Sequence, residues 1–253
     1  MFMQIVELRR ENMLTLKGKV AIVTGASRGI GKAISRSLAE FGVNLALNSR
    51  SLDQLEAMKE EFKGLNIDVL SCPADLSDPE ACVKIIEKVV QHFGGIDILI
   101  NNAGIAVPKS LSETTVNEWD MHMAINARAP FLLSREALPY LKKSDMATII
   151  NISSVVGYKG YINQGAYTAS KHALMGMTKV LAQEVFKDNV RVHIIAPGGV
   201  ATDMVTKTRP DLDESMLATP QEIADVVMFL LTHRGNAVID EINIRRFSNT
   251  PWK

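Results

Sequence analysis

A tyrosine and a lysine stand four residues apart, Tyr167 and Lys171, in a segment that we predict to form a helix from about Ala166. Residues at this spacing share one face of a helix, about one turn from each other. An ammonium beside a phenol favours the phenolate, which predicts a pKa for Tyr167 below its ordinary value of about 10. Such a phenol can give a proton to a carbonyl that is being reduced, or take one from an alcohol that is being oxidised. By itself the pair is also typical of a surface tyrosine beside a solvated lysine.

A serine lies thirteen residues before the tyrosine, just beyond an apolar segment that we predict to be a strand. The hydroxyl of this residue, Ser154, can reach a carbonyl that the phenol also touches. Ser154 is therefore predicted to orient a substrate and to stabilise the negative charge that develops on its oxygen. The alternative for Ser154 is a cap at the end of a strand.

Three glycines stand between the first predicted strand and an amphipathic helix, in residues 24–31. The N-terminus of a helix offers unpaired N–H groups and a partial positive charge, and the missing Cβ atoms let a pyrophosphate approach them. A loop of this kind predicts a dinucleotide site, although a turn with no ligand remains the alternative. The predicted binding residues of this loop are Gly25, Ser27, Arg28, Gly29, Ile30 and Gly31.

Short β-branched segments alternate with longer segments of helical spacing along the whole chain. Most of the former are apolar on both faces, which is typical of buried parallel strands. The alternation predicts an α/β fold, a single Rossmann-fold domain with a doubly wound parallel sheet of about seven strands and helices on both faces. Ligands of such folds bind at the carboxyl ends of the strands. The predicted strands are 20–24, 44–48, 68–72, 96–100, 148–152, 190–196 and 238–245, and helix starts near 79 and 220 follow from a first-turn proline and a capping box.

The composition is that of an ordinary globular protein, with 47% hydrophobic and 22% charged residues in 253. Equal numbers of basic and acidic residues, 28 each, give no overall field toward nucleic acid or membrane, which favours a small-molecule partner. The two cysteines and five histidines show no metal-like spacing, so no metal is predicted. The sequence indicates neither export nor a membrane span, and we expect a cytoplasmic protein. We predict an extension at 1–15, one domain at 16–253 and a substrate lid at 203–218.

The motifs together resemble the short-chain dehydrogenase/reductase family, from about Leu16 to at least Leu231. The resemblance rests on Thr-Gly-x-x-x-Gly-Ile-Gly in 24–31, Asn-Asn-Ala-Gly in 101–104, Ser154, Tyr-x-x-x-Lys and Pro197-Gly198, in the family's order. It implies a nicotinamide-dependent oxidoreductase in which Lys171 binds the nicotinamide ribose. Asn126 aligns with the asparagine that holds a water linked to this lysine. Further cofactor contacts implied by the resemblance are Asp75, Leu76, Asn102, Ala103, Gly104, Ile152, Pro197, Gly198, Val200 and Thr202.

The end of the second predicted strand favours NADP over NAD. An acidic residue there would bind a ribose 2′-hydroxyl, but Ser49 occupies that place and Arg50 follows it. The guanidinium groups of Arg28 and Arg50 could together clamp a 2′-phosphate. Either arginine could instead be a solvated surface charge.

The C-terminal segment bears on the substrate. Residues 236–245 depart from the ending that 3-oxoacyl-acyl-carrier-protein reductases usually have, and look more like the branch that acts on small hydroxy acids and assorted carbonyl compounds. A carbonyl reductase with a pocket shaped by Met204, Tyr161 and the lid is our leading interpretation. The fatty-acid step is the second, and a non-catalytic dinucleotide-binding or scaffold protein is the alternative of another class. The resemblance also implies a homodimer or homotetramer, paired through the predicted helices at 117–141 and 166–187.

Overall fold

Seven parallel strands form one sheet in a computed structural model that describes residues 16–209 and 211–251. The strand order is β3-β2-β1-β4-β5-β6-β7, so the chain reverses direction across the sheet between β1 and β4. The predicted doubly wound Rossmann fold is confirmed. The strands are β1 (Val20–Thr24), β2 (Asn44–Ser49), β3 (Val69–Pro73), β4 (Ile98–Asn101), β5 (Thr148–Ile152), β6 (Arg191–Pro197) and β7 (Glu241–Ile244).

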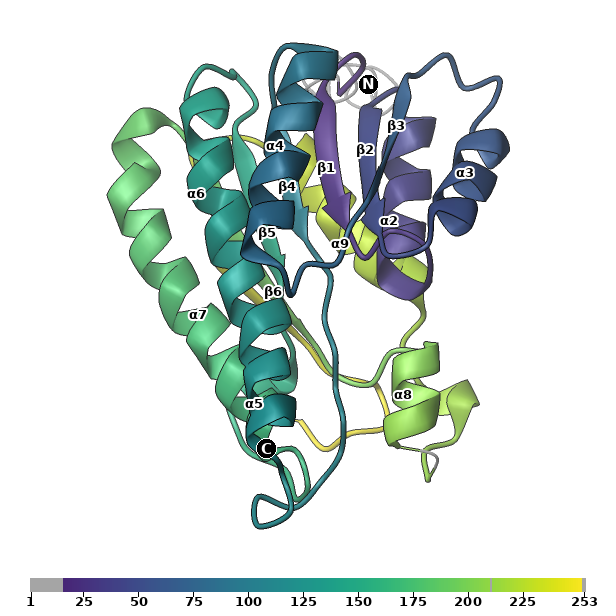
Figure 1. The fold of residues 1–253 in the computed structure, drawn as a ribbon, viewed down its shortest axis with the longest axis vertical. Coiled ribbons are helices and arrows are strands. Elements are labelled where there is room, and N and C mark those ends of the chain that lie inside the picture. The colour runs from purple at the N-terminus through teal and green to yellow at the C-terminus, as the bar shows by residue number, and fades with distance from the viewer. Residues whose placement is uncertain (1–15, 210, 252–253) are drawn as a thin grey trace, which may run out of the picture.

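Helices cover both faces of this sheet (Figure 1). One face carries α2 (Gly29–Glu40), α3 (Leu52–Glu61) and α9 (Pro220–Thr232), and the other carries α4 (Pro79–Phe93), α5 (Val116–Met123), α6 (Ala129–Leu141) and α7 (Gly165–Val185). The short helix α8 (Asp203–Thr208) lies beyond the carboxyl ends of the strands (Figure 1). The remaining turns of helix are η1 (Ala124–Arg128), η2 (Val155–Gly157), η3 (Phe186–Asp188) and η4 (Glu214–Met216).

Two helix starts were predicted from their caps, and both are confirmed. Asp78 accepts a hydrogen bond from the Glu80 N–H at 2.9 Å, directly before Pro79. Thr219 and Glu222 form a reciprocal capping box at the start of α9. Each cap satisfies N–H groups that a helix leaves unpaired in its first turn.

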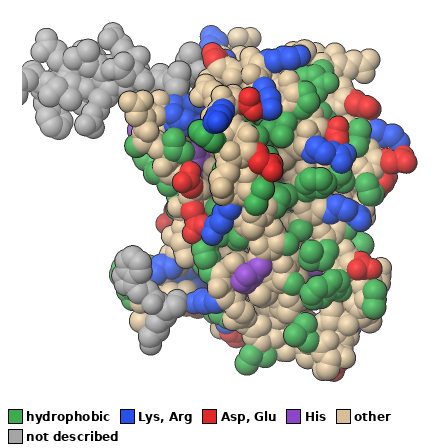
Figure 2. All heavy atoms as spheres, turned by 90° about the vertical axis from the view of Figure 1, so that its left-hand side faces the viewer, with side chains coloured by type: hydrophobic (Ala, Val, Ile, Leu, Met, Phe, Trp, Pro, Cys, Tyr) green, Lys and Arg blue, Asp and Glu red, His purple; other side chains and the backbone are tan. Residues whose placement is uncertain are grey.

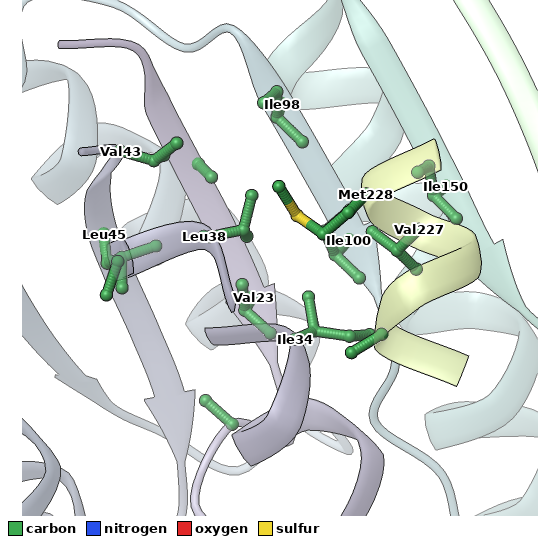
Figure 3. Close-up of a cluster of buried hydrophobic side chains, with 14 of the residues drawn as sticks. Val23, Ile34, Leu38, Val43, Leu45, Ile98, Ile100, Ile150, Val227 and Met228 are labelled. Carbon is green, nitrogen blue, oxygen red and sulfur yellow. The ribbon is translucent and has the colours of Figure 1, made fainter. Parts of the chain in front are cut away.

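A buried apolar layer fixes the glycine loop relative to the sheet. Ile34 and Leu38 of α2 pack with Val227 of α9 against β1 and β4 (Figure 3). Burying one such side chain contributes roughly 1.5–3 kcal/mol, so this layer holds the first turn of α2 firmly against the end of β1.

Strands β2, β3, β4 and β6 differ from their predicted bounds by one or two residues, and two predicted elements differ more. The helix predicted at 117–141 contains a π-helical turn, η1, between α5 and α6. A π-helical turn holds one residue more than an α-helical turn, and apolar spacing does not predict that extra residue. The strand predicted at 238–245 is shorter, because Val238 and Ile239 are exposed and precede β7, which lies at the edge of the sheet.

The ends and the lid segment complete the description. The predicted extension, residues 1–15, lies outside the described residues. Within 203–218, apart from residue 210, the structure shows α8 and η4, where no helix was predicted. No helix in the described part of the chain has the length and apolarity that crossing a membrane requires.

Candidate active site

The loop after β1 is held by hydrogen bonds to the segment after β4. The Thr24 hydroxyl oxygen accepts the N–H groups of Asn102 and Ala103, each at 3.0 Å. The Asn102 amide in turn donates to the Thr24 carbonyl at 2.9 Å and to the Gly25 carbonyl at 3.2 Å. The two motifs therefore form one rigid unit at the carboxyl edge of the sheet, where β1 and β4 are neighbours.

The glycines of this loop have different structural roles. Gly29 has a φ of +53° and begins α2, a conformation that favours glycine. Gly31 is buried, and a Cβ there would lie 2.2 Å from the Gly25 carbonyl oxygen and 2.5 Å from the Asn102 side-chain nitrogen. Gly31 was predicted to bind the cofactor, but it does not line the pocket; it lets the loop fold tightly onto Asn102.

A cleft of about 790 Å³ runs along the carboxyl edge of the sheet past this loop. Its volume lies in the range of cofactor and ligand sites. Most predicted cofactor residues line it together, although they come from the segments that follow β1, β2, β3, β4 and β6, from the end of β5 and from α7. They are Gly25, Ser27, Arg28, Gly29, Ile30, Ser49, Arg50, Asp75, Leu76, Asn102, Ala103, Gly104, Ile152, Tyr167, Lys171 and Thr202.

Three other predicted residues, from the segment after β6, do not line the cleft. The Gly198 N–H donates to the Ile244 carbonyl at 2.7 Å, and Val200 is buried in a β-bridge with Ala218. Pro197 ends β6. These residues position the following Thr202, whose methyl would lie 3.0 Å from a Cβ on Gly29. The segment after β6 therefore packs against the glycine loop.

The catalytic end of the cleft contains the tyrosine and the lysine. Both Tyr167 and Lys171 come from α7 and line the cleft, and the Ser154 hydroxyl hydrogen-bonds the Tyr167 phenol. Ser154 also accepts the Val156 N–H at 3.3 Å, so it is a cap of η2 as well as a partner of the phenol. The Lys171 ammonium donates to the Ile152 carbonyl at 2.8 Å and lies 5.9 Å from the centroid of the Tyr167 ring.

The predicted effect of this lysine on the tyrosine is wrong for this structure. Burial raises the pKa of Tyr167, and the hydrogen bond from Ser154 opposes that effect. Lys171 is 3% exposed, and burial lowers its pKa to about 8. Helical spacing predicts that the two groups are close, but it cannot predict that both lose water.

Asn126 lies in the π-helical turn η1 and is fully buried. Its amide donates to the Ile105 carbonyl at 2.9 Å and to the Ser170 hydroxyl at 3.0 Å, and its oxygen accepts the Ile105 N–H at 2.8 Å. A Cβ on Gly104 would lie 3.3 Å from the Asn126 oxygen and 3.6 Å from the Lys171 nitrogen. Asn126 thus ties the segment after β4 to α7 beside Lys171.

The other end of the cleft is exposed and cationic. Ser49 ends β2 and Arg50 follows it, and Arg28 forms an ion pair with Asp203 of α8 at 3.1 Å. The Asp75 carboxylate accepts the Ser77 N–H at 2.9 Å, and that bond, helped by Arg50, lowers the pKa of Asp75. Two further cations line this end and were not predicted, Lys32 and Arg36. Their position one turn apart on α2, directly after the glycine loop, was the signal that could have identified them.

The residues present fit a dinucleotide with a 2′-phosphate. Glycine backbone lies at the N-terminus of α2, and an anion could reach arginine side chains where an NAD site would have an acid. No group of His, Cys, Asp and Glu side chains in residues 16–209 and 211–251 could hold a metal ion.

A parallel sheet with this strand order, a glycine-lined dinucleotide cleft and a tyrosine-lysine pair define a Rossmann-fold oxidoreductase. The profile of the short chain dehydrogenase family matches residues 19–213, and the chain belongs to this family. The predicted family and enzyme class are confirmed.

Curated relatives and solved structures cover nearly the whole chain. The 3-oxoacyl-acyl-carrier-protein reductase FabG of Thermotoga maritima is 34% identical over 90% of this chain and 96% of its own length. The D-beta-hydroxybutyrate dehydrogenase of Rhizobium meliloti is 38% identical over 83% and 82%. A metagenomic short-chain oxidoreductase in complex with NADP has a TM-score of 0.81 at 34% identity, covering 93% of this chain and all of that one. An alcohol dehydrogenase of Thermococcus sibiricus, complexed with 5-hydroxy-NADP, has a TM-score of 0.85 at 30% identity, over 92% and 98%.

Proposed function

We propose that this chain is an NADP(H)-dependent reductase that interconverts a small carbonyl compound and its secondary alcohol. The observation that carries the proposal is that Tyr167 and Lys171 line the same cleft as the glycine loop. When bound there, the nicotinamide would give or accept the hydride. The protein has to place a carbonyl, supply a proton and exclude water.

Tyr167 is the proton donor for reduction and the proton acceptor for oxidation. Its phenol lies in the cleft and is hydrogen-bonded to the Ser154 hydroxyl, so both groups can meet one substrate oxygen. Ser154 orients that oxygen and stabilises the negative charge on it. Because the pKa of Lys171 is about 8, its ammonium is mostly charged at neutral pH, and its nitrogen lies 5.9 Å from the centroid of the phenol ring.

Asn126 is a positioning residue in this proposal. Its three hydrogen bonds join Ile105, after β4, to Ser170 of α7. They fix the wall of the cleft beside Lys171. The role implied by the resemblance, holding a water near this lysine, stays a prediction.

NADP(H) is favoured over NAD(H) by the cationic end of the cleft. Arg28 and Arg50 can both donate to a 2′-phosphate, and Ser49 replaces an acid that would repel it. Solved relatives at 30% and 34% identity were crystallised with NADP or a derivative of it. Of the remaining predicted residues that line the cleft, Asp75 would contact the adenine and Thr202 the nicotinamide carboxamide.

The substrate entrance carries exposed apolar side chains close to the catalytic end. Tyr161 and Ile162 precede α7, and Leu111 packs on Gly165 at the start of that helix. Met204 lines the cleft from α8, inside the proposed lid 203–218. This mouth suits an uncharged or partly apolar carbonyl compound.

A 3-oxoacyl-acyl-carrier-protein reductase is the second candidate, because a relative with that activity in its name matches over 90% of the chain. The two candidates differ in the size of the substrate. A thioester on a carrier protein needs a protein docking surface, whereas a small ketone needs only the cleft.

A substrate screen tests the proposal and separates the candidates. Oxidation of NADPH and NADH would be followed at 340 nm with aldehydes, ketoesters and a 3-oxoacyl thioester, and reduction of NADP+ and NAD+ with hydroxy acids. We expect turnover with NADPH and at least one small carbonyl compound. Turnover restricted to the carrier-protein thioester would select the second candidate, and no turnover with any carbonyl would refute the proposed activity.

We also propose that the protein is a homodimer or homotetramer in the cytoplasm. Both cysteines are free and buried, as is usual in a reducing compartment. Figure 2 shows hydrophobic side chains spread over the face that α6 and α7 form, and Phe131 and Val180 of these helices are exposed. Light scattering during size-exclusion chromatography would give the mass; a monomer at micromolar concentration would contradict this assembly.

A further inference from the structure

Lys32 and Arg36 form a second cationic wall of the cleft, apart from the two arginines of the loops. They lie four residues apart on α2, so their side chains share one face of the helix. Both line the cleft, as do Arg50 and Ser51, which follow β2. An anionic group bound at this end of the cleft would feel both charges.

One carboxylate pairs with both of these cations. Glu61, the last residue of α3, accepts from Lys32 at 3.0 Å and from the Arg36 Nε at 2.9 Å, with a further bond from an Arg36 Nη. Glu61 does not itself line the cleft. The hydrogen bond from Arg36 is the main cause of the lowered pKa of Glu61, so this carboxylate is ionised at neutral pH.

We propose that Glu61 is a specificity-determining residue for the phosphorylated end of the cofactor: it neutralises Lys32 and Arg36 and so limits how tightly the cleft holds a 2′-phosphate. The inference rests on the proposed NADP(H) cofactor. A 2′-phosphate has about two negative charges at pH 7 and competes with Glu61 for the same N–H donors. NAD(H) lacks that phosphate, so Glu61 has little influence on its binding.

The test is the affinity of the purified protein for NADPH and for NADH, measured by isothermal titration calorimetry. Glu61→Gln removes the charge and keeps a side chain that can still accept from Arg36. Because exposed ion pairs are individually weak, we expect about a three- to tenfold gain in NADPH affinity. The affinity for NADH should change by less than about twofold, and the gain should shrink as salt is raised.

The chain offers a matched control one residue away. Glu60 is on the same helix and pairs at 2.6 Å with Lys63, which does not line this cleft. Glu60→Gln makes the same change in net charge, and we expect wild-type affinity for both nucleotides. Adding Arg36→Gln to the Glu61→Gln variant should remove most of the gain, since one of the released cations is then absent.

Each outcome separates this inference from the proposed function. A Glu61→Gln variant that binds NADPH no better than Glu60→Gln does, or that gains equally for NADH, overturns the role of Glu61 while wild-type preference for NADPH upholds the cofactor. Wild-type protein that binds NADH as tightly as NADPH contradicts the proposed cofactor, and the inference is overturned with it.

Discussion

The polar side chains at the two ends of the cleft differ in their burial and in the kind of group that they pair with. At the catalytic end, Lys171 is 3% exposed and Asn126 is fully buried, and their partners are backbone or hydroxyl groups of the protein. At the cationic end, the side chains of Arg28 and Arg36 are 64% and 51% exposed, and their partners are carboxylates. The first end is poor in water, and the second is open to it.

This difference determines what each end can do. Burial changes the pKa of Tyr167 and of Lys171, which is what proton transfer requires. Exposed ion pairs are individually weak and are screened by salt, so they change cofactor affinity only modestly. We therefore expect changes at the buried end to alter turnover strongly, and changes at the exposed end to alter cofactor affinity modestly.

The largest effect is expected for Lys171→Met. Removing the cation that lies 5.9 Å from the centroid of the Tyr167 ring should lower kcat about a hundredfold or more, within the range known for proton-transfer groups. Lys179→Met, on the same helix but with a side chain 61% exposed, is the control and should keep nearly full activity. Similar rates for the two variants would show that burial beside Tyr167 is irrelevant.

A methyl group at Gly31 should disrupt the packing of the glycine loop against the segment after β4. Its Cβ would lie 2.2 Å from the Gly25 carbonyl, so Gly31→Ala should destabilise the fold by about 1–3 kcal/mol and abolish nucleotide binding. Gly176→Ala, on α7 with nothing within 4 Å of its Cβ, should be neutral or slightly stabilising. Thermal unfolding with and without NADPH measures both effects, and equal behaviour of the two variants would refute the packing role of Gly31.

The buried lysine should also reduce stability, with a pH dependence of known sign. Its pKa is about 8 in the folded protein and higher when unfolded, so the unfolded chain binds more protons between these values and stability rises with pH there. Lys171→Met should gain up to about 3 kcal/mol of unfolding free energy below pH 8. Urea titrations should show that this gain fades toward pH 10.5; a gain independent of pH would contradict desolvation as its cause.

The smallest effect is expected at the exposed end. Arg50→Gln should weaken NADPH binding by about tenfold, because one charge-assisted donor to the 2′-phosphate is lost. Binding of NADH should hardly change, which makes NADH the internal control in the same titration. An equal loss for both nucleotides would place Arg50 elsewhere than at the 2′-phosphate.

Sequence reasoning predicted local features well. Strands β1 and β5 have the predicted bounds, and the caps at Asp78 and Thr219 were found because a cap needs only neighbouring residues. Most of the cofactor residues that the motifs predicted line the cleft, but Gly31, Pro197, Gly198 and Val200 do not. The unpredicted π-helical turn at Asn126 depends on contacts with Ile105 and Ser170, which are distant in sequence.

Electrostatics was harder to predict than position. Spacing placed Lys171 beside Tyr167, but the direction of the tyrosine pKa depends on burial by the whole fold. The pairing of Lys32 and Arg36 with Glu61 joins α2 to α3 on one face of the sheet, and no local pattern predicts it. Loop glycines look alike in sequence, yet Gly31 packs against the loop while Gly25 lines the cleft.

The central claim is that the Tyr167 phenol transfers the proton at the buried end of the cleft. The most direct measurement is kcat of Tyr167→Phe with NADPH and the best carbonyl substrate, beside its NADPH affinity. We predict a fall in kcat of about a hundredfold or more with an affinity near that of the wild type. A variant that turns over at the wild-type rate would contradict the account.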